Sequence, residues 1–363
     1  MRSKHAPVPL TTSTSAYEAV DMVVWSGTGN TLRVAEQLAE AARSRGAVAH
    51  VLSSTSAVEA RPHSRRLLGL LAPTHGFTAP WPIIKAALTL PWVRGTDVFV
   101  LVTRGGTRVG GRTVPGFEGT AAYLPAALLA LRGARVRGVG AIDMPLNWTV
   151  IVPALDAEGI AEIVERGHTQ TDAFSKRLLS GNNAFEGRGR LVLGTLVLPL
   201  SLGYMLIGRL ILAKVFFADE RCTSCGTCER DCPQGAVRLI GKARRPYWTY
   251  DCQSCMRCMS NCPTDAIQGG QGWLLFYVWL ISLPIAEMAG TAFLGRFGIS
   301  AGWVSGVVRV LTGYFWIMVS VWLAYAAIWL ALFVPGLSFV LSRVTLTRIY
   351  RRYRGPRTTR GAG

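Results

Sequence analysis

The chain has 363 residues, half of them hydrophobic, and carries a formal net charge of +18. This length leaves room for two or three domains, and high hydrophobicity combined with strong basicity favours a membrane protein with Lys and Arg on the cytoplasmic side over a soluble enzyme. Nucleic-acid binding is the competing explanation for the charge, but the basic residues are spread along the chain and form no nucleic-acid motif, so no nucleic-acid partner is expected.

Residues 1–18 are polar and contain prolines, and they lack an apolar core long enough for a signal peptide. We expect them to form a disordered lead-in. A first domain is predicted at 19–182, beginning with the apolar run VDMVVW at 20–25, which is typical of a buried strand.

The first predicted strand is followed by a loop rich in Gly, Ser and Thr, and then by a helix. The loop reads Ser-Gly-Thr-Gly-Asn-Thr at 26–31, and apolar residues recur at helical spacing from Leu32 to Ala42. Glycines let the backbone approach an anion, hydroxyls donate hydrogen bonds, and the helix N-terminus supplies free N–H groups. The pattern favours phosphate binding, and an ordinary tight strand-to-helix turn is the alternative. It matches neither the Walker loop nor the dinucleotide Gly-x-Gly-x-x-Gly pattern.

Strands and helices alternate through the rest of this domain. Further strands are predicted at 48–53, 67–72, 98–102 and 136–142, with helices near 83–88, 121–131 and 157–179. This alternation predicts an α/β fold with a doubly wound parallel sheet. In such sheets ligands bind beyond the carboxyl ends of the strands, where the loops at 26–31, 73–81 and 103–112 would meet.

A hydrophobic segment is predicted at 188–215. Its stretch 191–213 is long enough to span a bilayer, but it carries Pro199 and Arg209. We expect a membrane-associated segment, either re-entrant or interfacial, because one full crossing would place the domains before and after it on opposite sides. A broken helix, or a hydrophobic linker packed against other membrane spans, is the alternative.

All eight cysteines lie in one repeated motif within a second domain predicted at 216–270. The two runs are offset by thirty residues, and each has the spacing Cys-x-x-Cys-x-x-Cys-x-x-x-Cys-Pro, which is the bacterial ferredoxin spacing for an iron–sulfur cubane. The first run is Cys222, Cys225, Cys228 and Cys232, and the second is Cys252, Cys255, Cys258 and Cys262.

In two-cluster ferredoxins the fourth cysteine of each run ligates the other cluster. This rule assigns one cluster to Cys222, Cys225, Cys228 and Cys262, and the other to Cys252, Cys255, Cys258 and Cys232. A zinc site is one alternative, but zinc takes pairs of ligands around one tetrahedral ion. A disulfide framework is another, which fits poorly because no cysteine lies outside the motif and disulfides belong to oxidising compartments.

Two apolar stretches after the cysteine motif are predicted to be transmembrane helices, at 273–294 and 303–334. Two crossings return the basic tail at 340–363 to the side of the cysteine domain, in agreement with the positive-inside rule. We therefore expect a multi-pass protein of the cytoplasmic membrane whose other domains face the cytoplasm. Glu287 is either a functional group within a span, for proton or quinone handling, or a residue near the membrane surface.

The loop at 26–31 resembles the FMN phosphate loop of flavodoxins. With the two cysteine runs, it makes residues 19–268 similar to the EFR1-type ferredoxin family. The resemblance implies a flavodoxin-like doubly wound parallel sheet, an α+β ferredoxin domain with two [4Fe-4S] clusters, transmembrane α-helices and one FMN. It implies FMN contacts at Ser26, Gly27, Thr28, Gly29, Asn30, Thr31, Thr74, His75, Gly76, Phe77, Thr103, Arg104, Gly105 and Gly106.

In this resemblance the first loop holds the FMN phosphate, and the two later loops lie along the two faces of the flavin ring. Phe77 offers an aromatic side chain in the first of these, whereas the second contains no aromatic residue. His75 is either near the flavin or capped within its own loop. Arg104, Arg108 and Arg112 either raise the flavin potential by stabilising the reduced anion or remain exposed to solvent.

These expectations describe electron transfer between FMN and two clusters. One hypothesis is an oxidoreductase at the cytoplasmic membrane face, which is bounded by lipid and passes electrons to a quinone-like or other small acceptor. The other is a carrier subunit that passes electrons between redox partner proteins without a substrate of its own. A redox sensor is a weaker third hypothesis, since no signalling domain is attached.

Overall fold

The computed structural model describes residues 14–54, 65–91, 93–185, 188–298 and 302–356. Most of the expected lead-in at 1–18 lies outside these described residues. The chain divides into two compact units. The first takes the chain up to Leu146 and again from Asp156 to Ser201, and the second takes Asn147–Leu155 and the chain from Leu202 onward.

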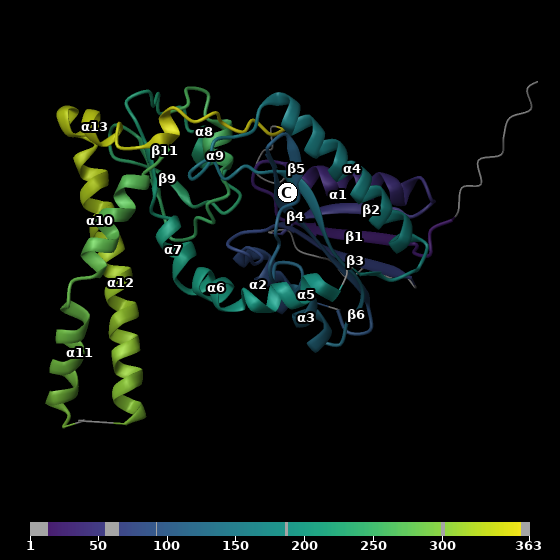
Figure 1. Ribbon diagram of the computed structural model, residues 1–363, viewed down its shortest axis with the longest axis horizontal. Helices are drawn as coiled ribbons and strands as arrows, with labels where there is room; N and C mark the ends of the chain where they lie inside the picture. Colours follow the sequence, from purple (N-terminus) through teal and green to yellow (C-terminus); the bar gives the residue numbers. More distant parts are fainter. Residues whose placement is uncertain (1–13, 55–64, 92, 186–187, 299–301, 357–363) are drawn as a thin grey trace, which may run out of the picture. The chain divides into compact units, whose positions relative to one another are not determined.

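A parallel sheet forms the centre of the first unit (Figure 1). Its strands are β1 (Ala19–Val24), β2 (Val48–Ser53), β3 (Arg66–Pro73), β4 (Asp97–Val109), β6 (Arg135–Pro145) and β7 (Ala184–Phe185). They lie in the order β2-β1-β3-β4-β6-β7, which contains the flavodoxin-like order of doubly wound folds. Every residue of β1 is buried, as expected for a strand covered on both faces. The predicted doubly wound α/β fold is confirmed.

Helices cover both faces of this sheet (Figure 1). Helices α1 (Asn30–Arg43) and α4 (Ala157–Leu179) pack together on one face, and α2 (Trp81–Thr89) and α3 (Tyr123–Leu131) on the other. Gly167 allows α4 to approach β6 closely, because a Cβ atom there would lie 2.5 Å from the carbonyl oxygen of Asp143.

The stretch at 103–112, expected as a loop, is instead largely a β-hairpin. Strand β4 continues to Val109, and β5 (Arg112–Val114) returns antiparallel to it. Gly110 and Gly111 form the turn with φ angles of 57° and 76°, and two positive φ angles suit the tight turns that match strand twist. The polar composition of this stretch therefore marks an exposed strand pair rather than irregular structure.

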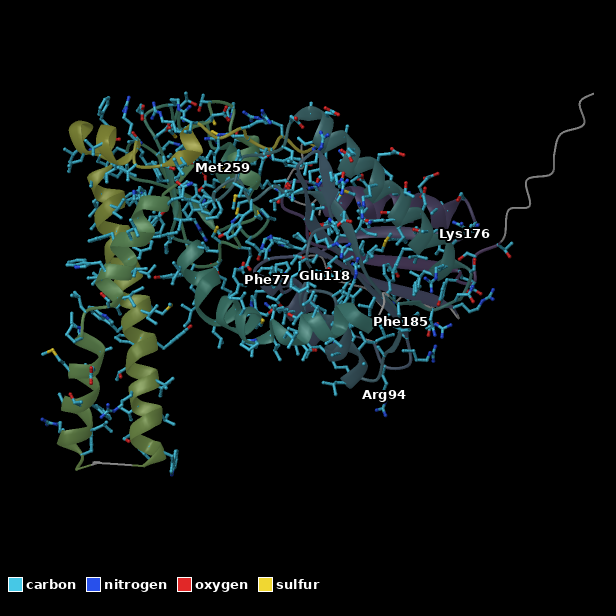
Figure 2. All side chains as sticks on the ribbon, in the orientation of Figure 1. Phe77, Arg94, Glu118, Lys176, Phe185 and Met259 are labelled. Carbon is cyan, nitrogen blue, oxygen red and sulfur yellow. The ribbon has the colours of Figure 1, made fainter. Side chains whose placement is uncertain are left out.

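The first domain also extends beyond its predicted end at 182. Strand β7 pairs with Gly138 and Val139 of β6, and Phe185 at its end is half-exposed (Figure 2). A two-residue strand is too short to produce a hydrophobic period, so the sequence pattern does not reveal it.

The second unit contains the cysteine motif within two small antiparallel strand pairs. Strand β8 (Phe216–Ala218) pairs with β11 (Ile267–Gly269), and β9 (Val237–Ile240) pairs with β10 (Arg245–Trp248). Short helices α8 (Thr227–Arg230) and α9 (Arg257–Asn261) occupy equivalent places in the two halves. Positive φ angles recur with the thirty-residue offset, at 224 and 254, 226 and 256, and 235 and 265. The sequence repeat is therefore also a repeat of backbone conformation.

A nine-residue segment that follows β6 in the sequence belongs to the second unit. Val150 of this segment is buried in the core of that unit, against Gly269. The Thr149 hydroxyl contacts Met259 Sδ at 3.1 Å, and the Ala154 N–H donates to the Arg351 carbonyl at 2.8 Å. The predicted boundary between two consecutive domains is thus too simple, because the chain enters the second unit twice.

Two helical stretches after β11 are long and apolar enough to cross a membrane. The first spans Gln271–Arg296 with mean hydropathy 1.5, and the second is α12 (Trp303–Ala331) with mean hydropathy 1.7. The first divides at Pro284 into α10 (Gln271–Ile281) and α11 (Ile285–Arg296), since proline cannot donate the helical hydrogen bond. Glu287 is exposed in the first turn of α11, where the helix dipole favours a negative charge.

The hydrophobic segment predicted at 188–215 is helical for most of its length. It comprises α5 (Arg188–Leu196), α6 (Leu198–Gly203), the π-helix η1 (Tyr204–Gly208) and α7 (Arg209–Leu212). Within the first unit, the Ser201 hydroxyl donates to the Phe77 carbonyl at 2.9 Å. Leu196 and Leu206 remain more than half exposed. The described backbone of this segment is thus mostly helical and includes one π-turn.

Candidate functional site

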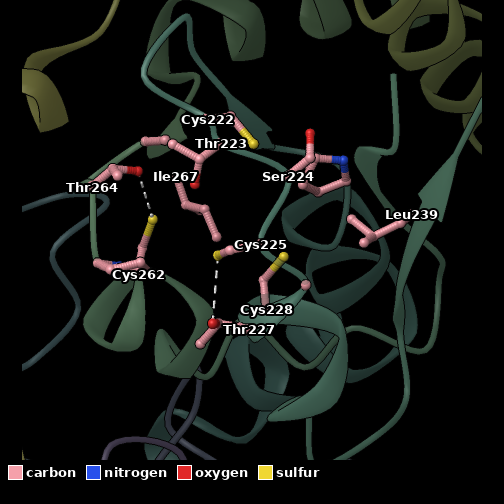
Figure 3. A pocket seen from close by; sticks show the side chains of 14 residues that line it. Cys222, Thr223, Ser224, Cys225, Thr227, Cys228, Leu239, Cys262, Thr264 and Ile267 are labelled. Carbon is pink, nitrogen blue, oxygen red and sulfur yellow. Dashed lines mark hydrogen bonds between the residues drawn. The ribbon is translucent and has the colours of Figure 1, made fainter. Parts of the chain in front are cut away.

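The first cavity of the second unit is lined by Cys222, Cys225, Cys228 and Cys262 (Figure 3). Three of these cysteines come from the loop before α8 and from α8 itself, and Cys262 caps the C-terminus of α9. The left-handed conformation of Gly226 turns the chain between Cys225 and Cys228. The cavity therefore combines three cysteines of the first run with the last cysteine of the second.

The second cavity has the reciprocal composition. Its cysteines are Cys232, Cys252, Cys255 and Cys258. Phe216, Trp248 and Met256 supply apolar walls, and the buried Arg257 also lines it. Each cavity thus takes one cysteine from the other run, which is the arrangement that the sequence rule predicts for cluster ligands.

The thiol groups around these cavities are crowded and withdrawn from water. Burial raises the pKa of Cys228 to about 12, and the neighbouring Cys222 and Cys262 act in the same direction. Burial likewise raises the pKa of Cys252. The pKa of Cys225 moves in the other direction, because hydrogen bonds with Thr227 lower it. Thiolates in such surroundings need a nearby positive charge, which a bound metal centre supplies.

The spacing of the thiols distinguishes between kinds of metal centre. In the part of the chain that the structure describes, no three Cys, His, Asp or Glu side chains are close enough to hold a single metal ion. Four thiols nevertheless surround each cavity. A zinc ion needs its ligands at about 2.3 Å from one point, whereas a cubane presents four separate irons to four cysteines. The donor set therefore fits iron–sulfur clusters better than zinc.

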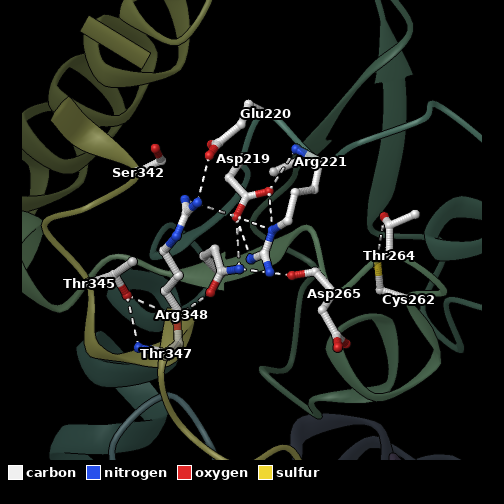
Figure 4. Close-up of polar contacts among 12 residues, drawn as sticks. Asp219, Glu220, Arg221, Cys262, Thr264, Asp265, Ser342, Thr345, Thr347 and Arg348 are labelled. Carbon is white, nitrogen blue, oxygen red and sulfur yellow. Dashed lines mark hydrogen bonds and ion pairs between the residues drawn. The ribbon is translucent and has the colours of Figure 1, made fainter. Parts of the chain in front are cut away.

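The C-terminal segment, predicted as a basic tail, packs on the part of the second unit that contains the cysteines. Arg348 pairs with Glu220 at 2.7 Å and approaches the buried Asp219, which also pairs with Arg221 (Figure 4). Arg354 pairs with Asp265 at 2.5 Å. In the described residues up to 356, the arginines of this basic segment are thus held by acidic groups of the unit that contains the cysteines.

In the first unit, the loop at 26–31 joins β1 to α1 and is buried throughout. Gly29 has a φ of 95° and precedes the first residue of α1. The Thr31 hydroxyl lies 2.8 Å from that of Thr103, and the Asn30 amide donates to the Pro145 carbonyl at 3.2 Å. The structure thus brings three predicted site residues together at the carboxyl ends of β1, β4 and β6. Hydroxyls beside the start of a fourteen-residue helix fit a phosphate group.

The second predicted loop is organised by its own backbone. The Thr74 N–H donates to the Thr103 carbonyl, and His75 and Thr78 bond to each other through backbone groups. The His75 ring meets Trp25 edge-on, with ring centroids 5.3 Å apart. Phe77 has a φ of 61° and lies 5.6 Å from the ring of Phe117 (Figure 2). Both candidate ring contacts for a ligand therefore already pack against aromatic neighbours of the first unit.

Gly105 and Gly106 have packing roles at their positions in β4. A Cβ atom on Gly105 would lie 2.5 Å from the Leu146 side chain, and one on Gly106 would lie 3.1 Å from Ile163. Side chains at these two positions would press on Leu146 and Ile163, so both glycines have a packing role besides any part in ligand contact.

Arg104 is neither exposed nor unpaired. Its guanidinium donates to the carboxylates of Asp143 and Glu118, in each case at 2.7 Å. Both carboxylates are buried, and Glu118 is labelled in Figure 2. These bonds raise the pKa of Arg104 although burial opposes them, and they lower that of Asp143. The sequence reasoning missed both acids. The aspartate within the apolar strand sequence GAIDMP could have indicated a buried acid that needs a basic partner.

Comparisons with known protein families and with solved structures find the same two kinds of domain in this chain. Residues 214–266 match the family described as a 4Fe-4S dicluster domain. A search of curated proteins finds no match. Among solved structures, the chain is similar to a flavodoxin from the domain Archaea, with 17% identity over 44% of this chain and 99% of that one and a TM-score of 0.29.

Two further structures share this similarity. Flavodoxin from Megasphaera elsdenii is 18% identical over 41% of this chain and 98% of that chain, with a TM-score of 0.25. Rubredoxin oxygen:oxidoreductase from Desulfovibrio gigas is 12% identical over 46% and 38%, with a TM-score of 0.27. The assignment of the two folds rests on the strand order of the first unit and on the cysteine motif of the second. A flavodoxin-like domain is fused to a 4Fe-4S ferredoxin domain.

Replacing Arg104 with Met should destabilise the first unit strongly. The change leaves two buried carboxylates without their shared cation, and breaking a buried pair in this way costs about 3–5 kcal/mol. Arg112→Met is the matched control, because Arg112 is exposed on β5, and we expect it to change stability by less than about 0.5 kcal/mol. Thermal unfolding followed by circular dichroism measures both, and equal melting temperatures for the two variants would contradict the analysis.

Proposed function

We propose that this protein is a membrane-anchored iron–sulfur flavoprotein, of the EFR1-type ferredoxin kind, that acts as an oxidoreductase at the cytoplasmic membrane face. The observation that carries the proposal is the pair of reciprocal four-cysteine cavities. When bound, two [4Fe-4S] clusters and one FMN would supply the electron-transfer chemistry, and the protein would supply binding, orientation and tuning.

The ligands follow from the two cavities. Cys222, Cys225, Cys228 and Cys262 would hold one cluster, and Cys252, Cys255, Cys258 and Cys232 the other. Ser26, Thr28 and Thr31, with the N-terminus of α1, would hold the FMN phosphate. Thr74–Phe77 and Thr103–Gly106 would lie nearest the flavin ring.

Membrane anchoring is supported by the exposure of the two apolar helical stretches. Only 11% and 28% of their most apolar windows are buried, and large side chains such as Leu275 and Trp303 are 76% and 80% exposed. Lipid would cover such surfaces. Both ends of the two-helix hairpin contact the unit that contains the cysteines, at Gly270 and at Thr345, which supports an even number of crossings. The basic residues of the C-terminal segment are the argument for the cytoplasmic side.

Metal and flavin content per chain tests the proposal. The full chain, extracted from membranes with detergent and purified without oxygen, should contain about eight irons and about one FMN. Iron without flavin would remove the FMN assignment but leave the clusters. Absence of iron from protein purified in this way would overturn the proposed function.

Serine substitutions test which cysteines share a cluster. Cys225→Ser identifies the electron paramagnetic resonance signal of the first-cavity cluster. Crossed ligation predicts that Cys262→Ser alters this same signal, although Cys262 belongs to the second run, and that Cys232→Ser alters the other signal. The reverse pairing, with Cys232→Ser acting on the Cys225 signal, would show that each run holds its own cluster.

A carrier that serves protein partners is the second candidate function, and the surface near the first cavity favours it. Cys225 is the one exposed cysteine among the eight, all of which the structure describes. Arg230, Arg238, Lys242 and Arg244 are exposed on the adjoining elements, and the Ser224 hydroxyl joins the cysteine loop to the turn that carries the last two. A basic rim around an exposed edge suits an acidic one-electron carrier protein.

Charge reversal tests this candidate. The double variant Lys242→Glu/Arg244→Glu should slow reduction by an acidic one-electron carrier by about tenfold or more at low ionic strength, and salt should remove most of the difference. Lys176→Glu/Arg177→Glu, on the exposed side of α4, is the control with the same change in net charge. Equal rates for the two variants would exclude this rim as a docking surface.

A further inference from the structure

Lys214 is a buried lysine whose neighbours belong both to the second cavity and to the apolar helices. It precedes β8 and is 1% exposed. Its ammonium donates to the Trp248 carbonyl and lies 3.3 Å from the Tyr247 hydroxyl. Trp248 and Phe216, two residues after Lys214, both line the second cavity.

Aromatic rings enclose the ammonium group. The Nζ atom lies 4.5 Å from the ring centroids of Tyr247 and Tyr250 and 4.6 Å from that of Tyr325 in α12. Such distances give favourable cation–π attraction, which is stronger in desolvated sites. Tyr277 of α10 donates to the Lys214 carbonyl at 2.6 Å. Two tyrosines from the apolar helices therefore help to fix the lysine beside the cavity.

A cysteine of the second cavity acts electrostatically on this lysine. Among the described residues, Cys252 is the charged group that acts on Lys214. Burial lowers the pKa of Lys214 to about 8, and the Cys252 thiolate opposes that effect. The three tyrosine rings around Nζ favour the charged ammonium form. A buried cation is costly unless an anion compensates it, and four thiolates around a cluster would make the second cavity such an anion.

The two cavities differ in their cations. Arg257 lines the second cavity, where Cys255, Cys232 and the carboxylate of Asp231 all act on its charge. The described lining of the first cavity contains neither Lys nor Arg. Arg352 acts on Cys262 of that cavity, but it also pairs with Asp265 at 3.5 Å. The second cavity therefore has a buried arginine in its lining and the buried Lys214 beside it, whereas the first has no basic residue in its described lining.

We propose that Lys214 is the counter-charge of the second cavity and holds the reduction potential of its cluster above that of the first. This inference rests on the proposed function, because it requires both clusters. A one-electron reduction by an external one-electron donor adds one negative charge at the cavity and breaks no bond. The Lys214 ammonium stabilises that added charge, so electrons collect at the cavity beside α10 and α12.

Redox titration of the anaerobically purified full chain, with dithionite as the donor and electron paramagnetic resonance as the readout, tests the proposal. Lys214→Met should lower the midpoint potential of the second-cavity cluster by at least 59 mV, which is a tenfold change in its reduced-to-oxidised ratio. The first-cavity cluster should keep its potential. Lys214→Arg should stay near the wild-type value, as should Lys176→Met, which removes an exposed lysine from α4.

Every outcome decides the proposal. Unchanged potentials in Lys214→Met, with full iron content, would overturn it. If Lys214→Met loses half of the iron while Lys214→Arg keeps it, the second cluster needs a positive charge at position 214 in order to bind. That result supports Lys214 as the counter-charge. Equal loss of iron in both variants would overturn the proposal. It would mean that the site enclosed by Tyr247, Tyr250 and Tyr325 needs the shape of the lysine side chain rather than its charge. Absence of clusters from the wild-type chain is a separate result, which removes the proposed function first.

Discussion

The constraint on which the second unit depends is that neither half of its repeat completes a cavity alone. Cys232 lies with the second run and Cys262 with the first, so the two halves must pack together before either set of four thiols exists. The pairing of β8 with β11, from opposite ends of the motif, enforces this packing. Crossing also places the two cavities next to each other, which suits short electron-transfer steps.

Charge follows from the same arrangement. Burial raises the pKa values of Cys228 and Cys252, and basic side chains act on cysteines of both cavities. Lys214 and Arg257 are buried beside the second cavity. The C-terminal arginines pack on the other side of the fold, where Asp219 and Asp265 hold them. Part of the +18 net charge therefore lies in buried or paired basic groups around the cysteines.

Patterns that are local in the sequence predict much of the fold. They do not predict which charged residues pair over long distances in the chain. The thirty-residue repeat and the strand–helix alternation predict both folds. The partners of Arg104 lie 14 and 39 residues away, and no period or spacing connects them. Gly110-Gly111 was a readable hairpin signal that the surrounding Arg and Thr residues obscured. The segment Asn147–Leu155 reads as an ordinary linker because its membership of the second unit depends on a partner surface encoded far downstream.

The two-helix hairpin is joined to the cluster fold at the strands that carry the cavities. Tyr277 and Tyr325 bond to the backbone around β8, at Lys214 and Phe216. Thr345 and Thr347, beyond the hairpin, bond to Gly269 of β11. Because β8 and β11 pair with each other, both ends of the hairpin hold one small sheet. A tilt of these helices would therefore move the tyrosines around Lys214 and, through them, the walls of the second cavity, so the two apolar helices and this cavity are mechanically linked.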